Sequence, residues 1–194
     1  MSDTQLALPS GERAGDPSVT VYGIIALGVS AVIAVATLFG AWLVIRSGTK
    51  VWPPGNTHLQ NYFGTTLCFT ALMAGMVGWW AVYAVRRDER RQAVVALAWV
   101  VFSQGAMINL ITFVVRESGL SARTNTYGVL YYALNIAVAA VFATGMGVAG
   151  VALARTLGGQ VTSRQPSLAW AAAWYGTMVS ASWFVMYAIV YIVK

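Results

Sequence analysis

Side chains that commonly bind metals or act as nucleophiles are scarce in this sequence of 194 residues, which contains one histidine and one cysteine. A structural zinc site needs about four ligands, and a bis-histidine haem needs two histidines. His58 has no cysteine, aspartate or glutamate close to it in the sequence. We therefore predict that the chain binds no metal ion and no cofactor through its own residues.

The sulfur-containing side chains also give no indication of a metal site or a catalytic residue. Cys68 has no second cysteine for an internal disulfide, and its apolar surroundings predict a small buried side chain. No serine or cysteine has a base partner that would make it a nucleophile, so we predict no catalytic residue. Six internal methionines could bind copper, but they are spread over four apolar segments, which favours packing in the core. They are Met73, Met76, Met107, Met146, Met178 and Met186.

Residues 145–150 read Gly-Met-Gly-Val-Ala-Gly, which matches the G-x-G-x-x-G string of dinucleotide-binding proteins. That motif requires a strand before it and a helix that begins within it. Here the string lies inside one continuous hydrophobic segment, where small residues let helices approach closely. We predict that Gly145 and Gly147 lie at helix contacts.

Five long apolar segments make up most of the chain, and the twelve basic and six acidic side chains lie at or beyond their ends. Each segment exceeds the ~20 residues that a helix needs to cross ~30 Å of hydrocarbon. Charged side chains are costly at the bilayer centre, so this spacing predicts an integral membrane protein. The predicted helices cover about 21–46, 61–85, 92–115, 127–154 and 167–193.

The predicted fold is an all-α bundle of five transmembrane helices, because backbone groups in lipid must be paired within the segment. Residues 1–20 form a polar N-terminal tail, and residues 21–194 form the transmembrane domain. The short connections predict that helices consecutive in the chain pack as antiparallel neighbours. Aromatic side chains towards the segment ends have the positions of interfacial residues. They are Trp42, Trp52, Trp79, Trp80, Tyr127, Tyr131, Tyr132 and Tyr191.

The net charge of +6 does not indicate nucleic-acid binding, because four arginines fall in one short turn between two apolar segments, at 86–91. Cytoplasmic loops of membrane proteins carry an excess of Lys and Arg. A cytoplasmic N-terminus places seven basic residues inside the cell, namely Arg13, the four arginines of this turn, Arg155 and Arg164. Five basic residues then lie outside, namely Arg46, Lys50, Arg116, Arg123 and Lys194. We therefore predict a cytoplasmic N-terminus.

Three amide side chains lie away from the ends of the apolar segments, namely Gln104, Asn109 and Asn135. An amide in hydrocarbon needs hydrogen-bond partners, so we favour a structural role in bonds between helices. The alternative is that these amides line a path for water or protons.

Two stretches resemble subunit III of the haem-copper terminal oxidases. Residues 171–183, Ala-Ala-Ala-Trp-Tyr-Gly-Thr-Met-Val-Ser-Ala-Ser-Trp, are similar to the closing helix of that family, with Trp174, Tyr175, Val179 and Trp183 as matches. A Trp-Pro-Pro loop follows the first helix and is followed by two further residues at a family-like spacing. These loop positions are Trp52, Pro53, Pro54, His58 and Asn61. Smaller similarities are the helix end from Phe39 to Arg46, the arginine-rich turn and the Tyr127-Gly128 pair.

Five helices in 194 residues match the short form of the family, and the resemblance covers about residues 21–194. The family carries buried titratable groups that this chain lacks. The family's glutamate, paired histidines, last-helix histidine and aspartate, and third-helix glutamate correspond here to Ala31, Val138, Val141, Thr177, Ser180 and Met107, while Gln104 is retained. The resemblance therefore implies architecture, docking and lipid binding, and not the family's support of proton supply.

Our leading hypothesis is a non-catalytic component of a respiratory haem-copper oxidase in the inner or plasma membrane. The resemblance implies oxidase subunits I and II and phospholipids as partners, with haem and copper in those partner subunits. Alternatives are a small homo-oligomeric transporter or channel, and an assembly factor of a membrane oxidoreductase, including nitric oxide reductase-type complexes. The candidate structural and interface residues are Trp52, Pro53, Pro54, His58, Gln104, Asn135, Gly145, Gly147, Trp174, Tyr175 and Trp183.

Overall fold

The computed structural model describes residues 17–53, 61–120 and 125–192. Five α-helices account for most of them: α1 (Pro17–Gly48), α2 (Asn61–Arg86), α3 (Arg90–Glu117), α4 (Thr126–Leu157) and α5 (Ser167–Tyr187). A π-helical segment, η1 (Ala188–Ile192), follows α5 directly. Within these described residues the regular structure is helical, apart from one isolated β-bridge between Thr162 and Gln165. The all-α prediction is confirmed.

Each of the five helical segments is long and apolar enough to cross a membrane. Their apolar stretches cover 26 to 32 residues, so each spans at least about 39 Å at ~1.5 Å per residue. The helices begin and end near the charged residues that separate the apolar segments. These features indicate a multi-pass membrane protein.

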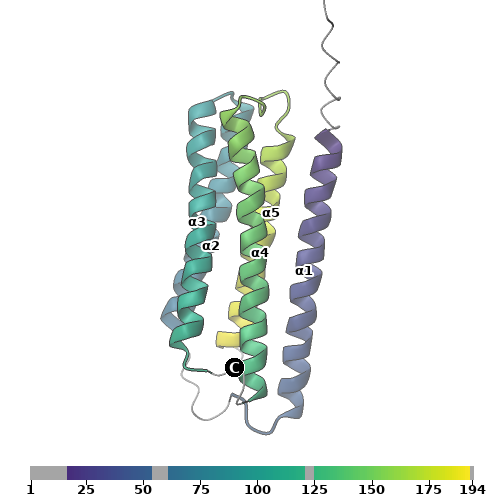
Figure 1. Ribbon diagram of the computed structural model, residues 1–194, viewed down its shortest axis with the longest axis vertical. Helices are drawn as coiled ribbons and strands as arrows, with labels where there is room; N and C mark the ends of the chain where they lie inside the picture. Colours follow the sequence, from purple (N-terminus) through teal and green to yellow (C-terminus); the bar gives the residue numbers. More distant parts are fainter. Residues whose placement is uncertain (1–16, 54–60, 121–124, 193–194) are drawn as a thin grey trace, which may run out of the picture.

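Helices α2, α3, α4 and α5 form a four-helix bundle, and α1 packs against α5 and α4 at one side of it (Figure 1). The prediction that consecutive helices are neighbours holds from α2 to α5 but is wrong for α1 and α2. The inward positions of α1, such as Gly28 and Trp42, contact aromatic rings of α4 and α5 instead. Residues 49–60 connect the end of α1 to the start of α2.

The two ends of the bundle differ in charge. The start of α1, the α2–α3 turn and the α4–α5 loop lie together at one end, and η1 lies near the other end (Figure 1). We call the first of these the basic end because six arginines lie there, namely Arg86, Arg87, Arg90, Arg91, Arg155 and Arg164.

The core has two parts of different composition. Towards the basic end, α2, α3, α4 and α5 pack through a cluster that consists mainly of alanines, including Ala81, Ala96 and Ala173. Small side chains let these helices approach closely. The other part is rich in aromatic residues, including Trp42, Tyr131 and Trp183, and also includes residues of α1.

The eight aromatic side chains near the helix ends fall into three groups, and Trp52 and Tyr132 form the partly buried one. Trp79 and Trp80 are 41% and 43% exposed, as the interfacial interpretation predicts. Trp42, Tyr127, Tyr131 and Tyr191 are at most 3% exposed, so that interpretation is wrong for them. Their rings fill the space between helices in the aromatic part of the core, where burial of apolar area stabilises the fold.

Candidate functional site

The Trp-Pro-Pro loop begins against the aromatic core. The Trp52 ring meets Trp42 of α1 edge-on with 5.1 Å between centroids, and it lies 4.9 Å from the Tyr127 ring of α4. Pro53 is partly buried beside it. These contacts fix the end of α1 against the start of α4. Pro54 and His58 lie outside the described residues.

The matched residues of α5 occupy three different environments. The partly buried Trp174 ring lies against Gly28 of α1, where a Cβ atom would come within 2.8 Å of it. Tyr175 is buried, and its hydroxyl lies 2.5 Å from Oγ1 of Thr144 on α4. The Thr144 hydroxyl donates to the Val141 carbonyl at 2.9 Å, so Tyr175 is the donor of the bond between them. Trp183 is fully buried in the aromatic core.

Gln104 and Gly145 lie in contact between α3, α4 and α5. A Cβ atom at Gly145 would come within 2.5 Å of the Gln104 Oε1 atom and 3.2 Å of the Tyr175 ring. The helix contact predicted at Gly145 therefore exists within this chain. A Cβ atom at Gly147 would meet nothing within 4 Å, so Gly147 faces away from the other described residues.

The three amides of the apolar segments lie at three separate places, and the predicted hydrogen bonds between helices are not formed by them among the described residues. Asn135 is buried, and its Nδ2 atom donates to the Tyr131 carbonyl one turn earlier, at 2.8 Å. Gln104 lies beside Gly145, ten residues further along α4 from Asn135 and therefore about 15 Å away along the helix axis. Asn109 is exposed on the outer face of α3. The structure does not bring these amides together along one path.

Buried polar atoms without a hydrogen-bond partner among the described residues include the indole nitrogens of Trp42 and Trp52 in the aromatic core and the Oε1 atom of Gln104 beside Gly145. The Tyr131 hydroxyl interacts with Tyr191 and Asn135, and the Trp183 indole interacts with the Cys68 thiol. Indoles donate hydrogen bonds, phenols and amides both donate and accept them, and all three keep the same charge near neutral pH. Such an interior suits packing and hydrogen bonding better than proton transfer.

Neutral side chains that contact neighbouring helices occupy the positions at which the resemblance places titratable groups. Ala31 and Val141 line one narrow apolar seam between α1, α4 and α5, together with Tyr175 and Ser182, and the seam leaves no room for a water molecule. Ser180 donates to the Ala71 carbonyl of α2 at 2.9 Å, and Thr177 accepts from the Trp79 indole at 3.0 Å. These hydroxyls connect α5 to α2.

Two loops are joined at the basic end, which the sequence did not predict. Asp88 of the α2–α3 turn accepts two hydrogen bonds from Ser163 of the α4–α5 loop. These bonds hold the pKa of the Asp88 carboxyl below its usual value, and the nearby Arg164 guanidinium lowers that pKa further. Asp88 has a φ angle of 57°, a left-handed conformation that is uncommon outside glycine.

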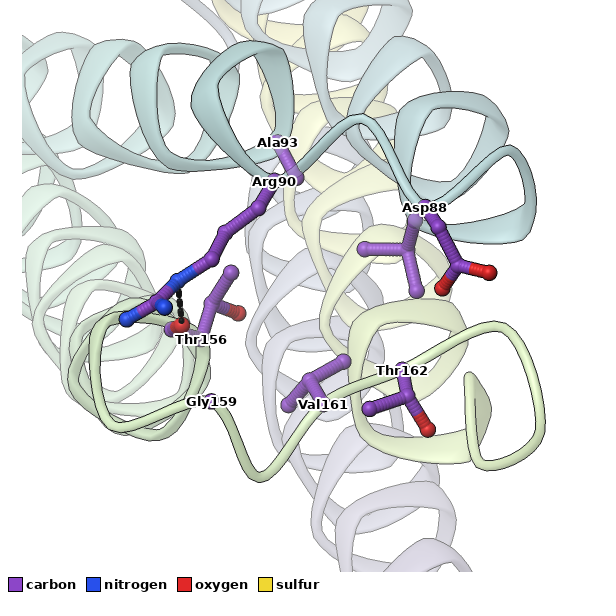
Figure 2. Close-up of a pocket in the computed structure, with 8 residues that line it drawn as sticks. Asp88, Arg90, Ala93, Thr156, Gly159, Val161 and Thr162 are labelled. Atoms are coloured by element: carbon purple, nitrogen blue, oxygen red, sulfur yellow. Dashed lines mark hydrogen bonds between the residues drawn. The ribbon is translucent and has the colours of Figure 1, made fainter.

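Arg90 reinforces the same junction. Its side chain crosses from the start of α3 to the end of α4, where Nε donates to the Thr156 carbonyl at 3.1 Å (Figure 2). Nη2 donates to the Leu157 carbonyl. These carbonyls lie at a helix C-terminus, where a cation is favoured. A cavity of about 210 Å³ lies between the loops, lined by Asp88, Arg90 and neighbouring residues.

No protein-family model and no curated protein sequence matches this chain.

Proposed function

We propose that this chain is a non-catalytic component, similar to subunit III, of a respiratory haem-copper oxidase complex. Its task is to stabilise the catalytic subunit and to hold phospholipid in the inner or plasma membrane. Electrons, oxygen and protons react in the partner subunits, which carry the haems and copper. The cytoplasmic N-terminus places the basic end on the cytoplasmic side.

The observation that best supports this proposal is the convergence of the residues that carry the resemblance. Phe39, Trp52, Tyr127, Tyr175 and Trp183 come from four segments of the chain, yet all contribute to the same aromatic core. If the short motifs resembled the family by chance, the matched residues would not be expected to pack together. If the chain shares the fold of the family, they would.

The character of the interior also favours a structural task. The residues that meet at the centre of the bundle are apolar, aromatic or neutral polar ones, and hydroxyl groups tie α5 to its neighbours. The transporter hypothesis is weaker, because Asn109 lies apart from the two buried amides.

The test is to purify the tagged chain from its native membranes in mild detergent and to record reduced-minus-oxidised visible spectra. Haem absorption at a fixed ratio to the chain supports the proposal. A preparation without haem contradicts it.

A further inference from the structure

The outer face of α3 changes character along its length. One stripe of exposed residues follows the helical repeat and begins with apolar and aromatic side chains, Val95, Trp99 and Phe102. Further along the same face the exposed Phe113 is accompanied by the exposed polar side chains Asn109 and Thr112, and then by Arg116 at the helix end. Polar side chains are costly where they meet lipid tails, so the amide of Asn109 on this face needs an explanation.

Asn109 is the critical residue. It lies about six residues from the middle of the 28-residue helix α3, which is about 9 Å and within the ~15 Å half-thickness of a hydrocarbon layer. In the described part of the chain the side-chain amide of Asn109 has no hydrogen bond. Thr112, by contrast, donates to the Ile108 carbonyl at 2.9 Å. An exposed amide at this depth is costly unless another molecule pairs with it.

The surface around Asn109 has room for a partner. A hollow of about 420 Å³ is lined by Asn109, Thr112, Phe113 and Arg116, together with Gly105 and Ile108. Helix α3 contacts α2 and α4 and lies on the side of the bundle away from α1 (Figure 1). The hollow therefore opens outwards and does not lead into the core.

We propose that this surface, from Gly105 to Arg116, docks a membrane-spanning helix of a different protein chain. That helix presents a hydrogen-bonding side chain to Asn109 and a carboxylate to Arg116. The inference rests on the proposed function in that it locates the surface at which a partner subunit binds.

Charge and depth favour this occupant over two others. In two parallel copies of this chain related by a two-fold axis, Arg116 would face Arg116, and the adjacent Glu117 does not line the hollow. A phospholipid headgroup reaches Arg116 at the helix end, but Asn109 lies about 10 Å deeper along the axis. A second helix can pair with both residues at once.

The experiment places a photoreactive benzophenone amino acid at Thr112 in the full chain, in native membranes. A matched control carries the same probe at Val95, on the outward stripe but outside the hollow. We expect Thr112 to cross-link to a membrane-spanning segment of another chain with a carboxylate near one end. Asn109→Leu should lower that yield about 3- to 30-fold after detergent dilution, as expected for one interhelical hydrogen bond. Phe102→Leu, the matched control, should leave the yield unchanged.

Three results would overturn the inference: cross-links to lipid alone, cross-links to a second copy of this chain, or a yield that Asn109→Leu leaves unchanged. Asn109 is exposed, so its substitution should not alter the thermal unfolding of the chain itself. The outcome is separable from the oxidase proposal. A cross-linked subunit of a complex without haem supports the docking surface and contradicts the oxidase assignment.

Discussion

Asp88 of the α2–α3 turn accepts hydrogen bonds from the amide of Ser163, at 2.9 Å, and from its hydroxyl, at 2.5 Å. The two residues lie 75 positions apart in the chain, and their contact joins the two loops at the basic end. Because the Asp88 carboxylate is the acceptor of these bonds, the contact between the two loops should weaken when the carboxylate is protonated.

The contribution of Asp88 should therefore depend on its ionisation. Because Ser163 and Arg164 hold the pKa of the Asp88 carboxyl below its ordinary value of 3.8, the stabilisation is complete above that ordinary value. It should be lost as the pH falls through the lower pKa of the folded state. We expect Asp88→Asn, which keeps a residue that tolerates the left-handed conformation, to lower the unfolding temperature near pH 6. The difference from the native chain should vanish at strongly acidic pH, where the Asp88 carboxyl is also neutral. The matched variant Glu89→Gln should show neither effect, and an equal effect of both would contradict the role of the contact.

Gly145 and Gly147 offer a matched pair on one helix. Gly145→Leu should destabilise the chain by at least about 1–3 kcal/mol, because the new side chain overlaps Gln104 and Tyr175. Gly147→Leu adds a side chain where nothing lies within 4 Å, so the stability of the isolated chain should not fall. Unfolding in mixed detergent measures both. Equal losses would show that Gly145 does not make the closer contact.

The bond between Tyr175 and Thr144 is suited to a double-mutant cycle. Tyr175→Phe and Thr144→Val each remove one hydroxyl, and the double variant removes both. We expect a coupling free energy of about 0.6–2 kcal/mol, the range for hydrogen bonds between membrane helices. The same unfolding assay provides the four values. A coupling of zero would mean that the 2.5 Å contact does not stabilise the bundle.

The orientation in the membrane can be tested with single cysteines, because the native Cys68 is buried. Thr162→Cys lies in the α4–α5 loop at the basic end, and Val51→Cys follows the far end of α1, where Val51 is 66% exposed. If the N-terminus is cytoplasmic, a membrane-impermeant maleimide added to intact cells should label Val51→Cys and not Thr162→Cys. The reverse labelling would mean that the orientation is inverted.

The sequence predicts the number and type of the helices, because charge and chain length alone decide which segments can cross hydrocarbon. It does not predict which side of each helix faces inwards. In segments that are apolar all round, Trp42 and Trp79 look alike, yet Trp42 is buried and Trp79 is exposed. Only the packing of neighbouring helices distinguishes them.

The same reason explains the other differences. Gly145 and Gly147 are two residues apart on one helix and therefore face different sides, and no pattern in the sequence tells which side holds a neighbour. The place of α1 beside α5 depends on how Gly28 meets the Trp174 ring, which is a contact between residues far apart in the chain. The pairing of Asp88 with Ser163 likewise requires the two loops to be placed first.

The haem content of the complex that contains this chain tests the central claim most directly. The tagged chain should be purified in mild detergent, and haem and copper should be measured before and after the chain is separated from its partners. We predict that both cofactors are present at a fixed ratio in the complex and remain with the partner subunits after separation. A complex without haem, or haem that stays with the isolated chain, would contradict the account.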